Sequence, residues 1–346
     1  MIDLPSSRLS FEGDGPVPEG QGWGWGERPT FLGNPFLIDD TGIRFKEGEE
    51  GSPAAYSPQA PLPEMGGKFS EWWVRRARSI MIVAGVDVGS LTAEAVVMKD
   101  GEILGYEIIN VRPTPIQSSM DVMLKTLIKC GLRLEDLNYC VSTGYGRDEI
   151  PFSKKSISEI SCHGKGAHWC NPAIRGIIDI GGQDCKAIMV GEEGDLVDFA
   201  MNDKCAAGTG RFLEIIAKAL GADITELGAM SFDSKTPLKI SNRCSVFAEY
   251  ETIFLLAEGK QAVDIGAGVN EAMAERAFSL AGRIKLNGNI GGGLTVTGGV
   301  AKNVGVTKNL AHLFQTEIAD LSWDPQIMGA LGAALFAQRN YEKESR

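Results

Sequence analysis

The sequence has no uninterrupted apolar run of the roughly 20 residues that a membrane-spanning helix needs. Its first residues carry neither the basic nor the apolar segment of a secretory signal. It also lacks a basic excess, because 34 Lys and Arg stand against 45 Asp and Glu and give a formal net charge of −11. Binding to nucleic acid or to an acidic membrane surface requires a basic face. We therefore expect a cytoplasmic protein with neither of these partners.

Cysteine is scarce in this chain. The 346 residues include seven cysteines, an odd number, and no export signal precedes them. A disulfide framework is therefore not expected, and metal or redox chemistry is the better interpretation of any special cysteine. Glycine is abundant, at 43 residues, and much of it stands in short clusters. Such clusters are typical of turns that let a backbone approach a phosphate group closely.

The chain changes character near residue 80. Residues 1–80 hold 9 of the 15 prolines and four of the six tryptophans, without helical or strand periodicity. We expect an irregular N-terminal arm and no independent catalytic domain here. Two interpretations stay open. The segment is a poorly ordered tail, or a start codon placed too early with Met81 as the true start; alternatively, it is an arm that docks its Trp side chains onto a partner subunit.

From Ile82 onward the pattern predicts an α/β fold. The segments 85–106 (GVDVGSLTAEAVVMKDGEILGY) and 177–199 (IIDIGGQDCKAIMVGEEGDLVDF) share an apolar strand, an Asp-x-Gly turn and a following hairpin. This internal repeat predicts two similar domains, 81–178 and 179–346, that face each other across a cleft. A helix is expected over 116–131, ending at Gly131, and another around 157–168.

Three glycine-containing turns are candidates for phosphate binding. The first is Asp87–Ser90, whose Asp can hold a hydrated Mg²⁺. The second is Asp179–Asp184, where Gln183 could orient a water. The third is Gly298-Gly299, which follows a strand and precedes a helix expected to begin near Ala301. Neither a Rossmann G-x-G-x-x-G nor a Walker A loop is present at the corresponding places.

The layout of these turns resembles the actin, sugar-kinase and Hsp70 superfamily. The resemblance matches its two phosphate motifs to Asp87–Thr92 and Asp179–Asp184, and its adenosine motif to Gly298–Asn303. It implies duplicated ribonuclease-H-like domains around a cleft that binds ATP and Mg²⁺. The catalytic candidates are then Asp87, Asp179, Gln183 and Asp184. The nucleotide-binding candidates are Gly89, Ser90, Thr92, Gly181, Gly182, Gly298, Gly299 and Asn303.

Two cysteines lie close to predicted helix N-termini. Cys205 precedes an amphipathic helix that begins near Arg211, and Cys244 precedes another that stops at Gly259. The helix dipole favours a thiolate, or an anionic cluster, at such a position. A free cysteine is otherwise often a small buried residue, which is the better interpretation for Cys130, Cys140 and Cys185.

The segments CAAGTGRF, RCSVFAEYE, STGYGR, ISEISCHGKGA and DIGGQD together resemble the BadF/BadG/BcrA/BcrD-type ATPase family over about 82–337. Its members activate 2-hydroxyacyl-CoA dehydratases or serve as ATP-binding subunits of benzoyl-CoA reductases. The resemblance implies an ATPase coupled to electron transfer through a 4Fe-4S cluster. Two cysteines from each of two subunits would hold the cluster, here Cys205 and Cys244. It further implies three kinds of partner: a second copy or a paralogous subunit, a ferredoxin or flavodoxin donor, and an acyl-CoA dehydratase or reductase.

The substrate of the partner enzyme stays open between two interpretations. The phrases GGQDCKAI and EISCHGKGAHWCNP favour a benzoyl-CoA reductase subunit, with a dehydratase activator as the alternative. A sugar or carboxylate kinase, or an ATP-dependent regulator, could use the same phosphate motifs without Cys205 and Cys244. His163, within ISCHGKGAH, is interpreted as a packed structural histidine and is left outside the catalytic set.

Overall fold

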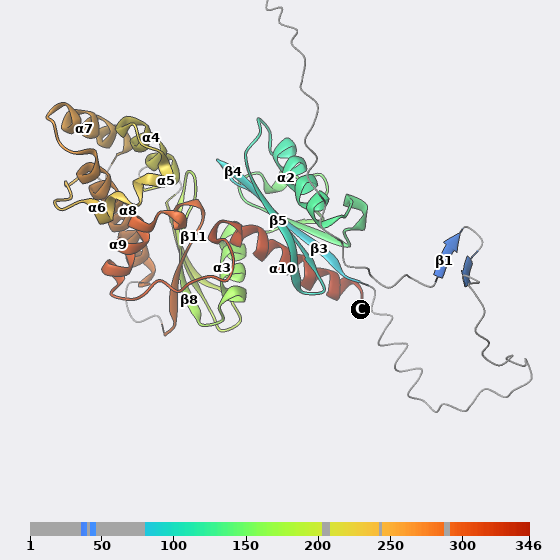
Figure 1. Ribbon diagram of the computed structural model, residues 1–346. Coiled ribbons are helices and arrows are strands. Elements are labelled where there is room, and N and C mark those ends of the chain that lie inside the picture. Colours follow the sequence, from blue (N-terminus) through green and yellow to red (C-terminus); the bar gives the residue numbers. More distant parts are fainter. Residues whose placement is uncertain (1–35, 40–41, 46–79, 203–207, 242–243, 287–290) are drawn as a thin grey trace, which may run out of the picture. The chain divides into compact units, whose positions relative to one another are not determined.

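The computed structural model describes residues 36–39, 42–45, 80–202, 208–241, 244–286 and 291–346. The chain divides into two units, Met1–Ser70 and Glu71–Arg346. Figure 1 shows the described elements of both units. In the first, β1 (Phe36–Asp39) and β2 (Gly42–Phe45) pair antiparallel. The rest of the predicted arm, including its tryptophans, lies outside the described residues. Within the described part, no helix is both long and apolar enough to cross a membrane.

The first sheet of the larger unit has the strand order β5-β4-β3-β6-β7. Its strands are β3 (Ile82–Val88), β4 (Thr92–Lys99), β5 (Glu102–Asn110), β6 (Tyr139–Thr143) and β7 (Lys155–Ser156). β3, β4 and β5 form an antiparallel meander, and β6 lies parallel to β3 on its other side. The two-residue turn at Asp100-Gly101, with both φ angles positive, keeps the meander tight, as the sequence predicts.

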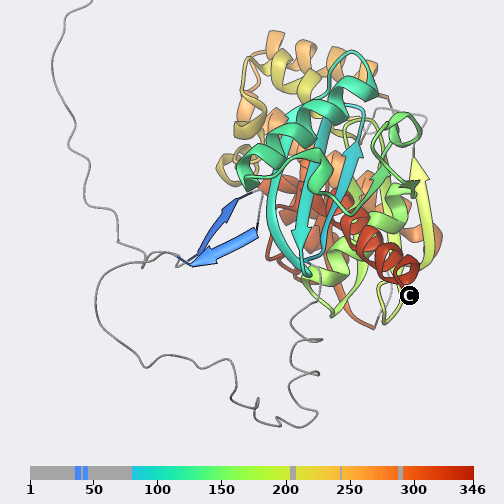
Figure 2. The same ribbon diagram turned by 90° about the vertical axis from the view of Figure 1, so that its right-hand side faces the viewer.

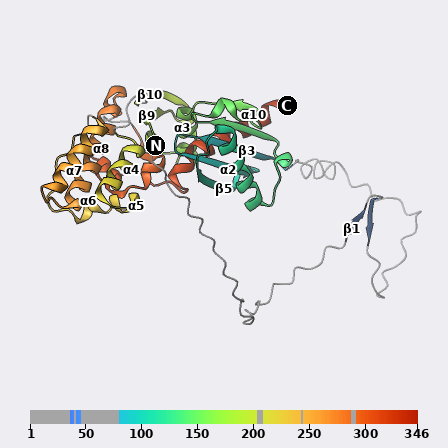
Figure 3. The same ribbon diagram turned by 90° about the horizontal axis from the view of Figure 1, so that it is seen from above.

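Two helices cover the opposite faces of this sheet, because successive side chains of a strand point to opposite sides. Helix α2 (Pro115–Cys130) packs on the face that carries Ala84 and Val86 and lies across the strands (Figure 2). Helix α10 (Met328–Glu344) packs on the face that carries Val83 and Val96 (Figure 3). α2 ends at Gly131 in the left-handed conformation, as predicted.

The second sheet repeats the plan, in the strand order β10-β9-β8-β11. Its strands are β8 (Ile174–Ile180), β9 (Cys185–Val190), β10 (Leu196–Asn202) and β11 (Gly293–Thr297). β8, β9 and β10 form an antiparallel meander, and β11 lies parallel to β8, as β6 does to β3. The duplication predicted from the sequence is therefore confirmed in the fold. The boundary between 81–178 and 179–346 stays a prediction.

Several helices gather beside the second sheet and share its core (Figure 1). They are α4 (Gly210–Leu220), α5 (Ile224–Leu227), α6 (Met230–Asp233), α7 (Ser245–Ala257), α8 (Ala262–Ala281) and α9 (Val304–Phe314). Short 3-10 turns lie at Leu134–Asp136, Arg147–Glu149, Gly282–Ile284, Gly299–Lys302 and Pro325–Ile327. The helix expected near Ala301 begins instead at Val304, because Asn303 caps it by accepting from the Val306 amide.

The two sheets are joined through a close helix crossing. Helix α3 (Glu159–Cys170) packs on the second sheet, α10 packs on the first, and the two helices pack on each other. Glycines make this approach possible: a Cβ at Gly332 would overlap the Cys162 carbonyl, and one at Gly166 would overlap the Met328 carbonyl. The last helix of the chain thus returns to the first sheet, a long-range contact that no local pattern predicts.

The close crossing of α3 and α10 predicts that Gly332→Ala lowers the stability of the protein. The added methyl meets backbone rather than a movable side chain, so overpacking is expected to lower the free energy of unfolding by about 1–3 kcal/mol. That loss should exceed the gain of about 1 kcal/mol in helix propensity. Chemical denaturation measures it. The matched control is Gly191→Ala, whose Cβ would meet Val197 at an ordinary 3.6 Å and should change stability by less than about 0.5 kcal/mol. Equal stability of the two variants would contradict the close crossing.

Candidate functional site

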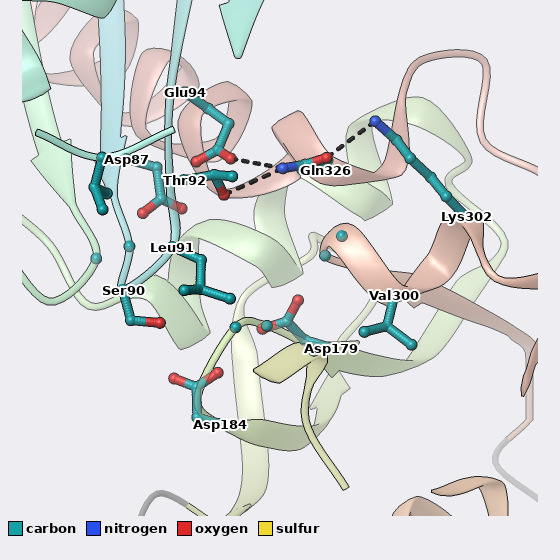
Figure 4. Close-up of a pocket in the computed structure, with 18 of the residues that line it drawn as sticks. Asp87, Ser90, Leu91, Thr92, Glu94, Asp179, Asp184, Val300, Lys302 and Gln326 are labelled. Carbon is teal, nitrogen blue, oxygen red and sulfur yellow. Dashed lines mark hydrogen bonds between the residues drawn. The ribbon is translucent and has the colours of Figure 1, made fainter. Parts of the chain in front are cut away.

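A pocket of about 620 Å³ lies where the repeated hairpins meet (Figure 4). This volume is within the range of small-molecule sites, about 300–1,000 Å³. The structure brings together these predicted residues in its lining: Asp87, Gly89, Ser90, Thr92, Asp179, Gly181, Gly182, Asp184, Gly298, Gly299 and Asn303. Gln183 is exposed and is not among the lining residues, so its role in orienting water stays a prediction.

The tips of the two hairpins approach each other across the pocket. Each tip is a tight turn, closed by Gly89 N–H donating to the Thr92 carbonyl in one and by Gly181 N–H donating to the Asp184 carbonyl in the other, both at 3.0 Å. A Cβ at Gly182 would lie 2.8 Å from Ser90 Oγ and 2.6 Å from Leu91 Cγ. Any larger residue there would have to displace the side chains of Ser90 and Leu91. The repeat thus places two backbone turns face to face, as a polyphosphate site requires.

The third glycine element closes the pocket beside the second hairpin. Gly298 has a φ of 82°, and a Cβ there would lie 2.9 Å from Asp179 Oδ1. Its amide donates to the Pro325 carbonyl at 3.1 Å. The side chain of Asn303 lines the pocket while capping α9 and donating to Asn270 Oδ1 at 3.0 Å. Hydrogen bonds from Gly298 to Pro325 and from Asn303 to Asn270 therefore fix the two ends of this element.

A buried lysine lies between two acids of the second hairpin. Lys186 Nζ is 2.7 Å from Asp184 Oδ1 and 3.1 Å from Asp179 Oδ2, and Thr297 Oγ1 donates to Asp179 Oδ1 at 2.9 Å. Burial alone would lower the pKa of Lys186, but the two carboxylates outweigh it and hold that pKa above its usual value. Burial likewise opposes ionisation of Asp179, yet its cationic and hydrogen-bonding partners keep its pKa below the ordinary value. In the sequence, Lys186 was recognisable only as the single charged residue of the apolar strand CKAIMV.

The acids of the first hairpin differ from Asp179, because their pKa values are raised rather than lowered. Asp87 and Glu94 face each other across the β3–β4 ladder, and both are buried. Burial raises the pKa of Asp87 well above its ordinary value, and the nearby carboxylates of Glu94 and Glu159 raise it further. Burial also raises the pKa of Glu94 to about 7. Glu94 was not predicted as a site residue, although an acid within the apolar run TAEAVVM was a visible signal.

The balance of charge in the pocket is acidic. Six acids and two lysines line it: Asp87, Glu94, Glu159, Asp179, Asp184, Glu214, Lys186 and Lys302. Carboxylate oxygens are the ligands that Mg²⁺ prefers, and Mg²⁺ is bound in proteins through one or two of them together with substrate phosphates. The donor set therefore fits Mg²⁺ bound with a nucleotide, and Asp87 and Asp179 occupy equivalent positions near the ends of β3 and β8.

A chain of hydrogen bonds spans one side of the pocket (Figure 4). Gln326 Nε2 donates to Thr92 Oγ1 and to Glu94 Oε1, each at 3.1 Å. Lys302 Nζ donates to Gln326 Oε1 at 2.9 Å and pairs with Asp324 at 2.8 Å. These bonds link the first hairpin to the segment that follows the glycine pair. Sequence reasoning missed Gln326 and Lys302, because their partners are distant in the chain.

The candidate cluster cysteines stand apart from the pocket. Cys244 is the N-cap residue of α7 and is partly exposed, rather than being buried in the core. Cys205 lies outside the described residues. Cys140 and Cys185 are buried, and burial raises each thiol pKa to about 12, as expected of structural cysteines. Among the described residues, no three His, Cys, Asp or Glu side chains gather to hold a metal ion.

The backbone connects the pocket to Cys244. The first amides of α4, those of Gly210 and Arg211, donate to the carbonyls of Gly181 and Gly182 at 2.8 and 2.9 Å. These amides have no partner within the helix itself. α4 then packs against α7, which begins directly after Cys244. The second hairpin is therefore connected to the position of Cys244 through α4 and α7.

Comparison with known proteins shows the family of this chain. The profile of the BadF/BadG/BcrA/BcrD ATPase family matches residues 84–337. The 2-hydroxyisocaproyl-CoA dehydratase activator of Clostridioides difficile is 43% identical over 260 residues, which are 74% of this chain and 95% of the relative. A solved structure of the activator of the 2-hydroxyisocaproyl-CoA dehydratase from Clostridium difficile with bound ADPNP has a TM-score of 0.72 at 41% identity. It covers 77% of this chain and 97% of the relative.

Similarity to a benzoyl-CoA reductase is weaker. A subunit of the benzoyl-CoA reductase of Thauera aromatica is 31% identical over 274 residues, which are 77% of this chain and 96% of the relative. The sequence expectation that favoured a benzoyl-CoA reductase subunit is therefore less well supported than its alternative, the dehydratase activator. The sequence segments that favoured the reductase lie in the second hairpin and in α3. Both elements contribute residues to the pocket, so these segments do not distinguish a reductase subunit from a dehydratase activator.

The raised pKa of Glu94 predicts a specific pH dependence of stability. Between its ordinary value of 4.5 and about 7, the folded protein holds a proton that the unfolded chain has released. The free energy of unfolding therefore falls as pH rises through this window, by up to about 3 kcal/mol, and levels off above it. Glu94→Gln, which keeps an acceptor for Gln326, should remove this loss.

Urea denaturation at about pH 5 and about pH 8 checks the prediction. The variant should exceed the wild type by less than about 1 kcal/mol at the lower pH and by about 3 kcal/mol at the higher pH. Glu102→Gln, at an exposed position of the same sheet, is the matched control and should show no such difference. A constant offset between Glu94→Gln and wild type at both pH values would contradict it.

Proposed function

This chain belongs to the BadF/BadG/BcrA/BcrD ATPase family, and from that premise we propose that it hydrolyses ATP to drive electron transfer to a 2-hydroxyacyl-CoA dehydratase. One observation carries the proposal: the family's two phosphate turns meet in a single acidic pocket that is mechanically joined to Cys244. The higher identity to a dehydratase activator than to a reductase subunit favours the dehydratase as partner.

In the proposed reaction the hairpin turns bind the phosphates of ATP through backbone amides. Asp87 and Asp179 hold Mg²⁺, and the third element, with Gly298, Gly299 and Asn303, contacts the nucleoside. Asp184 or Gln183 positions the attacking water. Lys186 keeps Asp179 ionised, so that a negative charge is in place for the metal before the nucleotide arrives. Preorganised charge of this kind is the main source of catalysis in phosphoryl transfer.

Cys205 and Cys244 would hold a 4Fe-4S cluster, which supplies single-electron transfer when bound. Cys244 fits this role, because it is partly exposed at the N-terminus of a helix of 13 residues. Since such a cluster takes about four thiolates, two per chain require a second subunit, either an identical or a paralogous chain. A ferredoxin or flavodoxin is the proposed electron donor.

The surface of α7 supports contact with another protein beside Cys244. Five apolar side chains of this helix are 52–72% exposed: Val246, Phe247, Tyr250, Ile253 and Phe254. They recur at helical spacing and so form one stripe. A contiguous exposed apolar surface is typical of a protein-binding site. The stripe begins at the proposed cluster ligand and is suited to a subunit or dehydratase contact.

A kinase on the same fold is the competing function. It would bind ATP in the same pocket but would need neither Cys205 nor Cys244 for its chemistry. The partly exposed position of Cys244 and the stripe on α7 favour the electron-transfer function. Iron content separates the two functions, because only the first requires it.

The first prediction of this function concerns iron. Protein purified without oxygen should carry about two irons per chain, since one four-iron cluster would serve two chains. Cys244→Ala should lose this iron, while ADP binding stays within about threefold, because Cys244 is not among the residues that line the pocket. Cys130→Ala, at a half-buried cysteine on α2, is the matched control and should keep the iron. Iron-free wild type with intact ATP hydrolysis would leave a kinase or regulator instead.

The second prediction concerns the partner enzyme. The reduced protein with Mg²⁺ and ATP should activate 2-hydroxyisocaproyl-CoA dehydratase, as measured by formation of the unsaturated acyl-CoA. Asp179→Asn should keep its iron but lose activation, because the buried charge that holds Mg²⁺ is gone. In a parallel assay the protein should fail to support benzoyl-CoA reduction by reductase subunits. Activity in the second assay alone would reverse the choice of partner.

A further inference from the structure

His163 lies where the two repeats and the pocket meet. It stands on α3 and is only 6% exposed. Its Nδ1 is 3.0 Å from Thr297 Oγ1 on β11 and 3.2 Å from Asp179 Oδ1 on β8. Its Nε2 is 3.8 Å from Asp87 Oδ2 on β3. One ring therefore lies between the equivalent aspartates of the two hairpins.

The surrounding backbone is built to leave this arrangement room. Gly329 of α10 packs directly on it: a Cβ there would overlap Asp87 Oδ2 and would lie 2.9 Å from His163 Nε2. The ring, the two aspartates and Thr297 come from four different elements, and all four residues are buried. A histidine that only filled space in the core would not need to place its ring nitrogens beside these polar groups.

The hydrogen bonds assign a proton to one ring nitrogen. Thr297 has one hydroxyl proton, which it donates to Asp179 Oδ1 at 2.9 Å. Its oxygen then accepts from His163, which assigns a ring proton to Nδ1. Nε2 faces Asp87.

We propose that His163 is a positioning residue for ATP hydrolysis: through Nδ1 and Thr297 it fixes the orientation of the Asp179 carboxylate, and its ring sets the spacing between Asp179 and Asp87. The inference rests on the proposed function, because it takes the pocket to hydrolyse ATP. Losing the ring leaves the phosphate turns intact, so nucleotide binding is preserved. The carboxylate loses one of its restraints, so the rate of the chemical step falls.

The test uses the full chain, purified without oxygen, with three replacements of His163. Asn places an amide donor where Nδ1 stands, Gln places one where Nε2 stands, and Ala removes both. The readouts are kcat and KM for ATP, the Kd for ADPNP with Mg²⁺, and the unfolding temperature. His312→Asn, at an exposed position of α9, is the matched control.

His163→Ala and His163→Gln are expected to lower kcat by about 10- to 100-fold, the range for partners that orient a metal-binding carboxylate. The Kd for ADPNP should change by less than about threefold in every variant, because the residues that bind the nucleotide remain. His163→Asn should recover kcat to within about threefold of the wild type, since the contact to Thr297 is restored. The control should match the wild type throughout.

Thr297→Val is an independent variant that keeps the shape of the side chain and removes its hydroxyl. It should lower kcat as His163→Ala does, and the double variant should be little worse than either, because both act on one carboxylate. Additive losses in the double variant would overturn the proposal. So would a kcat for His163→Asn as low as that of Ala, or a loss of kcat that follows the unfolding temperature across the series.

The outcomes separate this inference from the function on which it rests. Absence of ATP hydrolysis in the wild-type protein overturns the proposed function and the inference together. Normal hydrolysis in the wild type and in His163→Ala overturns the inference alone and returns His163 to a structural role. Recovery by Gln rather than Asn also overturns it, because the essential nitrogen would then face Asp87.

Discussion

The buried ion pair network of Lys186 with Asp179 and Asp184 is the constraint on which the site depends. All three residues are at most 4% exposed, and removing one partner from such a group typically costs about 3–5 kcal/mol, because an unpaired charge stays buried. Each member is fixed by a different part of the fold. Asp184 closes the turn of the second hairpin, Asp179 is held by Thr297 from β11, and Lys186 lies near the start of β9. The hairpin can therefore hold an ionised carboxylate only when the second sheet is fully assembled.

The two hairpins have the same backbone arrangement but different electrostatic environments. Asp87 and Asp179 occupy equivalent strands, yet burial among acids raises the pKa of Asp87, whereas the neighbours of Asp179, namely His163, Lys186 and Thr297, keep its pKa low. The difference comes from the second residue of β9, a lysine, and from Glu94 on β4, an acid. The environment of the second hairpin thus favours the ionised carboxylate of Asp179, and Glu94 on the first hairpin can hold a proton near neutral pH.

Local features of the fold could be predicted from the sequence, and distant contacts could not. The Asp-x-Gly turns, the hairpin at Asp100-Gly101 and the end of α2 at Gly131 are specified by residues within a few positions of one another. The return of α10 to the first sheet is specified by glycines that match a helix far away in the chain. The same division holds in the site. The turns were predicted, but Lys186, Glu94 and Gln326 acquire their roles from partners that only the fold brings near, and His163 looked like a core residue for that reason.

The connection from the pocket to Cys244 depends on how a helix begins. The first amides of any α-helix lack partners within the helix, and in α4 the carbonyls of the second hairpin supply them. A displacement of that hairpin would therefore pull on the end of α4 along its axis, where a helix is stiff. α4 packs on α7, and Cys244 is the N-cap of α7. The second hairpin, which is proposed to bind phosphate, and Cys244, the proposed cluster ligand, are thus connected through two packed helices. Under the proposed function, nucleotide binding would act on the position of Cys244 through this connection, without direct contact between the nucleotide and the cluster.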